Sequence, residues 1–468
     1  MMKTMVSIRV IFLAPLLLCG CGTVFGSSYV RPDVQTPSVW DQAKAEPANS
    51  VSTAWWKSFN DETLNKLVDE ALAKNNDLAA SALKVKQARL KANLAVDQFL
   101  PDLSASGTVS NRRSLSQNGT ITRSYGASVA ASYEVDLWGK LASEMDSAEW
   151  EAKATQEDKE SAAIALIGTT VDLYWNIAYM NERISLSEAS LDYLRKTLDL
   201  AKTRHDEGAI SSIDLAAAEK SLAAQEAAHT QYLQSKVEAM NAFDILFDSP
   251  PGTFKANPTC LPKGELKSLE AGIPATLLER RPDLRAAEHR LREALSDEDA
   301  LRMSYLPGFS LTGSLGSSSV ALTNVLTNPV GTLGAGITLP FLNWFDMKNN
   351  VAVSEAEYEE AIVSFRQTLY SAFADVENAL SAQTKDVEQG RKLREAFSHA
   401  LKEEELYGVQ YKEGFIALQS WLDAQESRRN AEASVLENIY SQINDRVTLY
   451  KALGGDVNAS PLIVPPAI

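Results

Sequence analysis

Residues 124–138 read SYGASVAASYEVDLW and alternate strictly between two kinds of side chain. One face would carry Tyr125, Ala127, Val129, Ala131, Tyr133, Val135 and Leu137. The other face, from Ser124 to Asp136, is small or polar. A period of two is typical of a β-strand with one apolar and one polar side, as in a strand between lipid and water. A soluble antiparallel sheet with one buried face is the alternative interpretation.

Three further segments, at about 102–110, 308–316 and 331–341, alternate in the same way. Aromatic residues gather near the strand ends, as a bilayer interface favours: Tyr125, Tyr133, Trp138, Phe309, Phe341, Trp344 and Phe345. After the leader the chain has no run of about 18 apolar residues, so any membrane crossing is expected from strands. Four strands cannot close a membrane barrel, whose smallest examples have about eight. Two copies would give eight strands and a filled interior, so a pore favours three copies.

A displacement of 206 residues maps one half of the chain onto the other without a gap. The matching positions are Leu100 and Leu306, Pro101 and Pro307, Ser104 and Ser310, Asp77 and Asp283, Trp138 and Trp344, and Gly208 and Gly414. Two tandem copies of one structural unit are therefore predicted. We expect repeat 1 at 70–252 and repeat 2 at 276–458. A segment at 21–69, a proline-rich linker at 253–275 and a tail at 459–468 complete the chain.

Long helices are predicted after each strand pair. Proline is absent between Pro101 and Pro250 and between Pro340 and Pro461. Apolar residues recur at steps of three and four, as in coiled coils: Ile164, Ile167, Val171, Tyr174, Ala178, Ile184, Leu191, Leu194, Leu198 and Ala201. A helix over 141–203 would be about 95 Å long at 1.5 Å per residue, several times the thickness of a bilayer. We therefore expect the helices to project far into the periplasm.

Each long helix is expected to end at a glycine turn, at Gly208 in RHDEG and at Gly414 in YKEG. Glycine suits the left-handed position that stops a helix. Ser211, followed three residues later by Asp214, resembles a capping box that starts the return helix. At the matching positions the second copy has Ala417 and Ser420, so this cap is expected to be missing there.

Residues 1–20 form a predicted lipoprotein signal peptide, with Lys3 and Arg9 before the apolar run 10–18. Gly20 before Cys21 predicts acylation at Cys21, and an ordinary signal peptide with incidental cysteines is the alternative. The net charge of −16 argues against nucleic acid as a partner. The four histidines do not have metal-ligand spacing, and no phosphate loop or nucleophile elbow occurs. We therefore expect no enzymatic activity, no cofactor and no metal.

Several motifs together resemble one family. LLERRPDLRAAE at 277–288, LPGFSLTG at 306–313, LYKALGG at 449–455, the lipobox and the two glycine turns are similar to those of TolC-like and OprM-like outer-membrane channel lipoproteins of tripartite efflux systems. The resemblance implies a mixed α and β fold. It also implies a homotrimer with a shared twelve-stranded transmembrane β-barrel, a long periplasmic α-helical barrel and an equatorial domain.

The resemblance further implies a passive, gated exit duct for drugs and toxic compounds in the outer membrane, anchored in its lipids at Cys21. The implied partners are a periplasmic adaptor and an inner-membrane pump of the resistance and division (RND) type. A channel for type I protein secretion and a non-conducting lipoprotein that braces the envelope are the alternatives.

By the same resemblance, seven residues near the turns contact the adaptor: Gly208, Ser211, Ser212, Leu215, Gly414, Leu418 and Leu422. Asp423 matches a carboxylate of the periplasmic gate. Ser420 stands where relatives can have a second carboxylate, so a double acidic ring is in doubt. Asp214 is the alternative source of a second ring, or serves as a helix cap, and the two roles are compatible.

Overall fold

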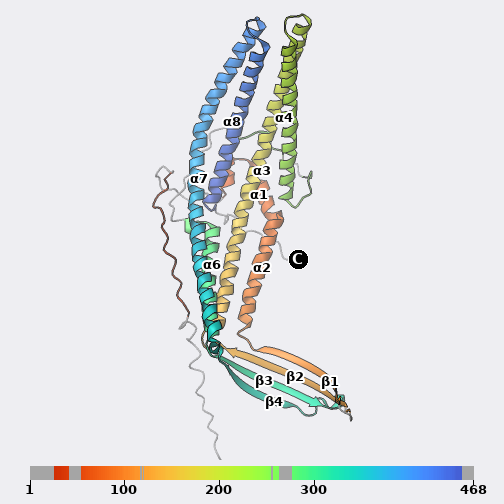
Figure 1. The fold of residues 1–468 in the computed structure, drawn as a ribbon, viewed down its shortest axis with the longest axis vertical. Coiled ribbons are helices and arrows are strands. Elements are labelled where there is room, and N and C mark those ends of the chain that lie inside the picture. The colour runs from red at the N-terminus through yellow and green to blue at the C-terminus, as the bar shows by residue number, and fades with distance from the viewer. Residues whose placement is uncertain are drawn as a thin grey trace, which may run out of the picture. The chain divides into compact units, whose positions relative to one another are not determined.

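The computed structural model describes residues 26–41, 54–115, 119, 121–253, 257–262 and 277–455 (Figure 1). The fold is mixed α and β with four strands, as predicted. Its elements are η1 Trp55–Phe59, α1 Glu62–Lys74, α2 Asn76–Asp97, β1 Asp102–Arg113, β2 Ile121–Val135, α3 Lys140–Asp206, α4 Ser212–Ile245, α5 Leu277–Arg280, α6 Pro282–Ser304, β3 Gly308–Ser319, η3 Leu322–Asn324, β4 Val330–Thr338, η4 Pro340–Leu342, α7 Trp344–Lys412 and α8 Leu418–Ala452. The predicted leader, including Cys21, and most of the predicted linker lie outside the described residues. Among the described helices, none is apolar enough over a sufficient length to span a membrane.

The four strands form one antiparallel sheet in the order β1-β2-β3-β4. Leu103 pairs with Ala131 in the first hairpin, and Phe309 pairs with Ile337 in the second. Each member of the second pair lies 206 positions after its counterpart, so the register of the sheet repeats with the sequence. The duplication is therefore a duplication of structure.

The strands are longer than expected, and the predicted boundaries at 110, 124 and 316 are wrong. β1 continues to Arg113, β2 begins at Ile121 and β3 continues to Ser319. The added residues are mostly polar, which made them resemble loop. Their hydroxyls pair across the ladder instead, because Ser110 and Ser124 lie 3.2 Å apart, oxygen to oxygen. Cross-strand pairs of this kind stabilise a sheet.

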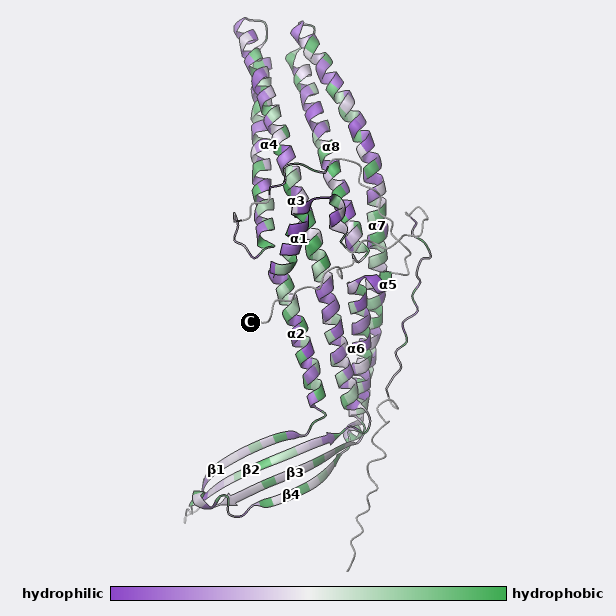
Figure 2. Cartoon of the chain, turned by 180° about the vertical axis from the view of Figure 1, so that it is seen from behind, coloured by the Kyte–Doolittle hydropathy of each residue, from purple (hydrophilic) through white to green (hydrophobic). Residues whose placement is uncertain are grey.

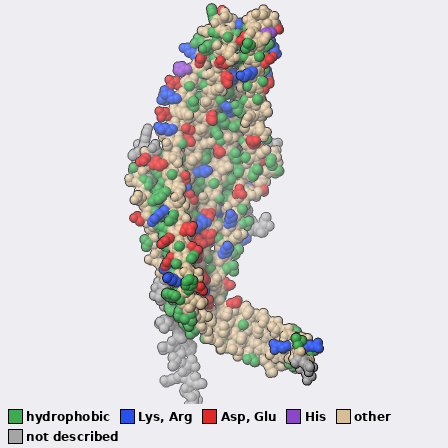
Figure 3. Space-filling model, viewed as in Figure 1, with side chains coloured by type: hydrophobic (Ala, Val, Ile, Leu, Met, Phe, Trp, Pro, Cys, Tyr) green, Lys and Arg blue, Asp and Glu red, His purple; other side chains and the backbone are tan. Residues whose placement is uncertain are grey.

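Hydrophobic and polar residues alternate along the strands (Figure 2). Large apolar side chains are widely exposed on the sheet, including Val109 at 76% and Leu333 at 92%. β3 and β4 contain no charged residue. On the face shown in Figure 3 the sheet is nearly uncharged apart from arginines at one end, whereas acidic and basic side chains cover the helices. An extended, exposed apolar surface of this kind is typical of a region that contacts lipid or another chain.

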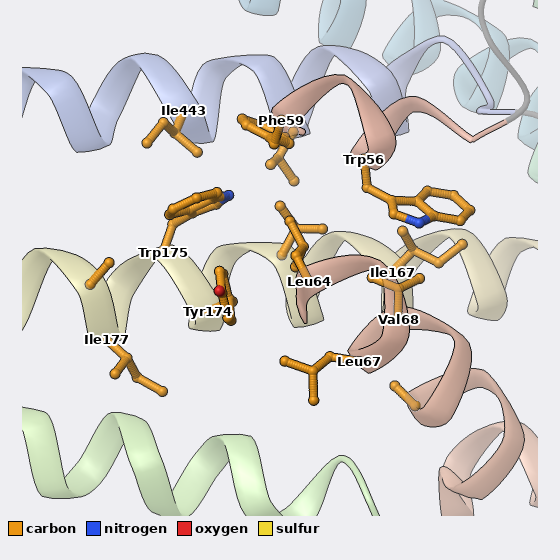
Figure 4. Close-up of a cluster of buried hydrophobic side chains, with 14 of the residues drawn as sticks. Trp56, Phe59, Leu64, Leu67, Val68, Ile167, Tyr174, Trp175, Ile177 and Ile443 are labelled. Carbon is orange, nitrogen blue, oxygen red and sulfur yellow. The ribbon is translucent and has the colours of Figure 1, made fainter. Parts of the chain in front are cut away.

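Contacts divide the chain into two units, each of which takes segments from both repeats. The first contains Lys84–Thr155 and Ala286–Arg366, and includes the sheet. The second contains Val34–Leu83, Gln156–Arg285 and the chain from Gln367 onward. In the second unit a buried cluster joins η1, α1, α3, α4 and α8 (Figure 4). Its side chains include Trp56, Phe59, Leu64, Tyr174 and Trp175 from segments distant in the sequence.

The predicted apolar stripe of α3 is confirmed. Nine of its ten members are buried: Ile164, Ile167, Val171, Tyr174, Ala178, Leu191, Leu194, Leu198 and Ala201. Ile184 is half-buried. The stripe holds helices together over the length of the second unit, because most stability of a long helix comes from packing of its apolar face.

Within the first unit the segment 26–33, here called the N-terminal strap, is bound to α6. The Ser27 hydroxyl donates to Asp299 at 2.7 Å, and the Arg31 guanidinium donates to Glu288 at 2.6 Å. The Glu288 side chain also accepts from Arg292 at 3.0 Å. Burial alone would raise the pKa of Glu288, but the hydrogen bonds from Arg31 and Arg292 outweigh it and lower that pKa.

We expect the strap to detach from α6 on acidification. Because the pKa of Glu288 is lowered in the folded state, its stabilisation is complete above the usual carboxyl pKa of about 4 and is lost as the pH falls below it. Hydrogen exchange of residues 27–31 should accelerate in that range, and Glu288→Gln should give the same acceleration at pH 7. Glu298→Gln is the matched control, because Glu298 lies on α6 but pairs with Arg302. Equal protection in Glu288→Gln and the original chain would contradict this role.

Candidate functional site: the paired glycine turns

The turn between α3 and α4 ends its helix with a left-handed glycine. Gly208 has a φ of +74°. Its N–H donates to the His205 carbonyl at 2.9 Å, and the Ala209 N–H donates to the Arg204 carbonyl at 2.7 Å. These two bonds form a Schellman motif, which satisfies carbonyls that the helix would otherwise leave unpaired.

The turn between α7 and α8 repeats this geometry. Gly414 has a φ of +79°, and its N–H donates to the Tyr411 carbonyl at 3.0 Å. The Phe415 N–H donates to the Gln410 carbonyl at 2.9 Å. The two turns therefore match bond for bond at the predicted displacement. Both lie at the same end of the second unit (Figure 1).

The return helices start differently, as the sequence predicts. The Asp214 N–H donates to the Ser211 hydroxyl at 3.3 Å, and the Ser211 N–H donates to the Asp214 carboxylate at 3.0 Å, which completes a capping box. Ala417 caps α8 without a side-chain bond. Asp423 is exposed and accepts from the Gln419 amide, and Ser420 is half-buried. Asp214 is thus held by its cap, whereas Asp423 projects from a helix with a weaker start.

Between the two hairpins lies a buried cluster, here called the tip core. It consists of Leu194, Leu198, Ala201, Ala218, Tyr411, Leu418, Trp421 and Leu422. Tyr411 stacks on Trp421 with ring centroids 5.1 Å apart, and Tyr193 meets Trp421 edge-on at 6.2 Å. Burial and the Glu404 carboxylate raise the pKa of Tyr193, so its hydroxyl stays protonated.

Arg204 joins the two hairpins directly. Its guanidinium donates to the carbonyls of Tyr411 and Lys412, both at 3.0 Å, and lies 4.5 Å from the centre of the Tyr411 ring. A cation beside the last carbonyls of a helix is favourable, because these carbonyls carry the negative end of the helix dipole. Arg204 near the end of α3 therefore stabilises the end of α7. The sequence analysis missed this residue.

The residues expected to contact an adaptor differ in exposure. Gly208, Ser211, Ser212 and Gly414 are exposed, Leu215 is half-buried, and Leu418 and Leu422 belong to the tip core. Two apolar side chains beside the turns were also missed, Ile213 at 81% and Phe415 at 80% exposure. Large apolar residues exposed at chain reversals were the signal that could have identified them. Among the described residues, no group of three or more His, Cys, Asp or Glu could hold a metal ion.

A four-stranded sheet with an exposed apolar face, carried on a chain with paired coiled hairpins, is the architecture of outer-membrane channel proteins. The family model described as outer membrane efflux protein matches residues 67–245 and 273–455. The chain belongs to this family, whose members are transport channels of the outer membrane.

Two curated relatives span nearly the whole chain. Toxin and drug export protein A of Aggregatibacter actinomycetemcomitans is 30% identical over 439 residues, covering 94% of this chain and 95% of that protein. Outer membrane protein OprJ of Pseudomonas aeruginosa is 29% identical, covering 92% of each.

Solved structures agree. The open state of the MtrE outer membrane channel of Neisseria gonorrhoeae is 29% identical, with a TM-score of 0.80 over 92% of this chain and 98% of that one. The CmeC outer membrane channel of Campylobacter jejuni is 25% identical, with a TM-score of 0.83 over 92% of this chain and 95% of that one. The predicted family, fold class and outer-membrane location are confirmed.

Proposed function

We propose that this chain forms the homotrimeric exit duct of a tripartite efflux pump, and that its hairpin ends serve as gate and docking site. The observation that carries the proposal is the Arg204 clamp, which fastens two structurally equivalent hairpins at their turns. A contact confined to the ends of long helices can be broken without unfolding the cores along their length. It therefore suits an opening that must close when no pump is attached.

The docking partner is a periplasmic adaptor, which presents the duct to an inner-membrane pump of the RND type. The exposed residues Gly208, Ser211, Ser212 and Gly414 lie beside exposed Ile213 and Phe415. Apolar anchors surrounded by small polar residues are typical of a protein interface. Leu418 and Leu422 would act from the tip core by holding this surface in shape. Cys21 would anchor the chain in outer-membrane lipids.

The gate would contain a ring of Asp423 carboxylates, one from each copy. Asp423 is exposed, so its charge faces solvent. Like charges around an axis repel one another and attract cations, which would bias both opening and ion passage. Asp214 would contribute less, because its oxygens already serve the cap of α4.

Joining Asp423 positions across the axis should block export. In a Cys260→Ser background, oxidation of Asp423→Cys should give covalent dimers and loss of export of a fluorescent efflux dye, and a reductant should restore export. Glu219→Cys is the control, because Glu219 is exposed on α4 away from the turn. Crosslinked cells that still export the dye would exclude Asp423 from the gate.

Protein export is the second candidate, because the printed name of one relative includes toxin as well as drug export. Deleting the gene separates the two. Accumulation of small toxic compounds in the deletion strain supports drug efflux, whereas loss of one secreted protein without such accumulation supports the alternative. Purified protein that never conducts in planar bilayers, even after Arg204→Ala, would favour a bracing lipoprotein.

A further inference from the structure

Both edges of the sheet lack a partner within the chain. β1 and β4 are the outermost strands, and every residue of both is exposed. Unpaired backbone N–H and C=O groups along a strand edge are not tolerated in hydrocarbon. The sheet of an outer-membrane channel therefore needs another strand at each edge.

The displacement of 206 residues fixes which residues would meet there. Inside the chain, β2 of repeat 1 pairs with β3 of repeat 2, with Val129 opposite Leu315. The corresponding junction between copies joins β4 of repeat 2 to β1 of repeat 1 in the next copy. Moving Val129 forward by 206 gives Ala335, and moving Leu315 back by 206 gives Val109. The same operation converts the first hairpin into the second without error.

We propose that β4 of one copy pairs antiparallel with β1 of the next copy, with Ala335 opposite Val109 of the partner subunit. The register then places Ile337 opposite Gly107 of the partner subunit, and Thr338 opposite Ser106 of the partner subunit. This inference rests on the homotrimer proposed above and adds its residue-level interface.

The side chains at the two edges fit this register. Within the chain, glycines on the polar face lie opposite hydroxyl residues: a Cβ on Gly126 would meet the Thr108 Oγ1 at 2.7 Å, and one on Gly336 would meet the Ser310 Oγ at 2.8 Å. The register gives Gly336 a second hydroxyl neighbour, Thr108 of the partner subunit. On the apolar face it sets the large Ile337 against Gly107, where a Cβ would find nothing within 4 Å.

The register also lets the sheet close with its apolar side outward throughout. Paired residues lead from Ala105 to Val129, Leu315 and Gly331 across one copy. The next step reaches Arg113 of the partner subunit, so the ladder advances from position 105 to position 113. An even advance keeps the same face outward, and a regular stagger of this kind is what closure of a sheet requires.

The symmetry stops at the strand ends. In repeat 1 the Asp136 carboxylate accepts from the N–H groups of Gly139 and Ala142, and α3 begins at Lys140. Leu342 occupies the place of Asp136 in repeat 2, and α7 begins at Trp344, two residues earlier in the repeat. The proposed register therefore covers the strands and not the helix starts.

Disulfide trapping tests the register. In a Cys260→Ser background, Thr338→Cys with Ser106→Cys should oxidise to covalent oligomers at least about ten times faster than Thr338→Cys with Ser110→Cys. Four residues along a strand amount to about 13 Å, which is beyond disulfide reach. The two variants are matched, because Ser106 and Ser110 each face a serine hydroxyl on β2. Ile337→Cys with Gly107→Cys repeats the test on the other face.

The outcomes separate this inference from the trimer on which it rests. Trapping at Ser106 and at Gly107, in a protein whose native mass in detergent is that of three chains, supports the register. Preferential trapping at Ser110 in such a trimer overturns the register and leaves the trimer in place. A native mass of one or two chains, with no trapping by any pair, overturns the trimer itself.

Discussion

Replacing Arg204 with alanine should raise the open probability of the reconstituted channel about 100-fold. In each copy the change removes two charge-assisted hydrogen bonds to the end of α7 and one cation–π contact. Such bonds contribute about 1.5–3 kcal/mol when buried, and partial exposure reduces this to about 1 kcal/mol per chain. Three chains then favour the closed state by about 3 kcal/mol, which is about a hundredfold in an equilibrium constant. Single-channel recording in planar bilayers measures the effect.

Two further variants make the result specific. Arg204→Lys keeps the charge but not the forked geometry, and should give an intermediate open probability. Arg195→Ala removes an exposed arginine from the same helix, where it pairs with Asp192, and should leave gating unchanged. If Arg204→Ala records like the original channel, the clamp is not part of the closed state.

Replacing Trp421 with alanine should loosen both hairpin ends. The side chain is 5% exposed and contacts Tyr411 and Tyr193, so its removal leaves a large cavity in the tip core. Such truncations cost about 3–5 kcal/mol. Amide exchange near the turns should therefore accelerate about 100-fold or more, because local opening sets the exchange rate. Hydrogen exchange with mass spectrometry resolves these segments.

Trp421→Phe is the matched variant, because a smaller ring keeps part of the stack on Tyr411 and the contact with Gly408. It should show a much smaller acceleration than alanine. Peptides around Trp55, in the separate cluster of the second unit, should exchange as in the original chain. Acceleration spread evenly over the second unit would show that the tip core does not open on its own.

The fold was predictable where a period was visible in the sequence. A period of two located all four strands, and steps of three and four located the buried stripe of α3. Gly208 and Gly414 located the turns, because only a left-handed residue completes a Schellman motif without strain. Strand ends were less predictable, because a serine in a ladder and a serine in a loop read alike.

The site was less predictable because its contacts cross between hairpins. Arg204 reads as a cation favouring its own helix end, and nothing local indicates that it binds carbonyls 207 and 208 positions later. Leu418 and Leu422 were assigned to the docking surface by resemblance, whereas the tip core encloses them. The two packing units also combine segments from both repeats, so their limits follow from contacts and not from the chain. The predicted domain boundaries and site roles stay predictions.

The paired strands obey a parity rule. Each ladder joins odd positions to odd positions and even positions to even positions. A single inserted or deleted residue within a strand would turn every later side chain in that strand over, whereas two would not. Since the two copies diverged, their strands could therefore lengthen or shorten only in whole pairs. The connections after Arg113 and Ser319 are free of this count, and are where the outward surface of such a channel can change freely.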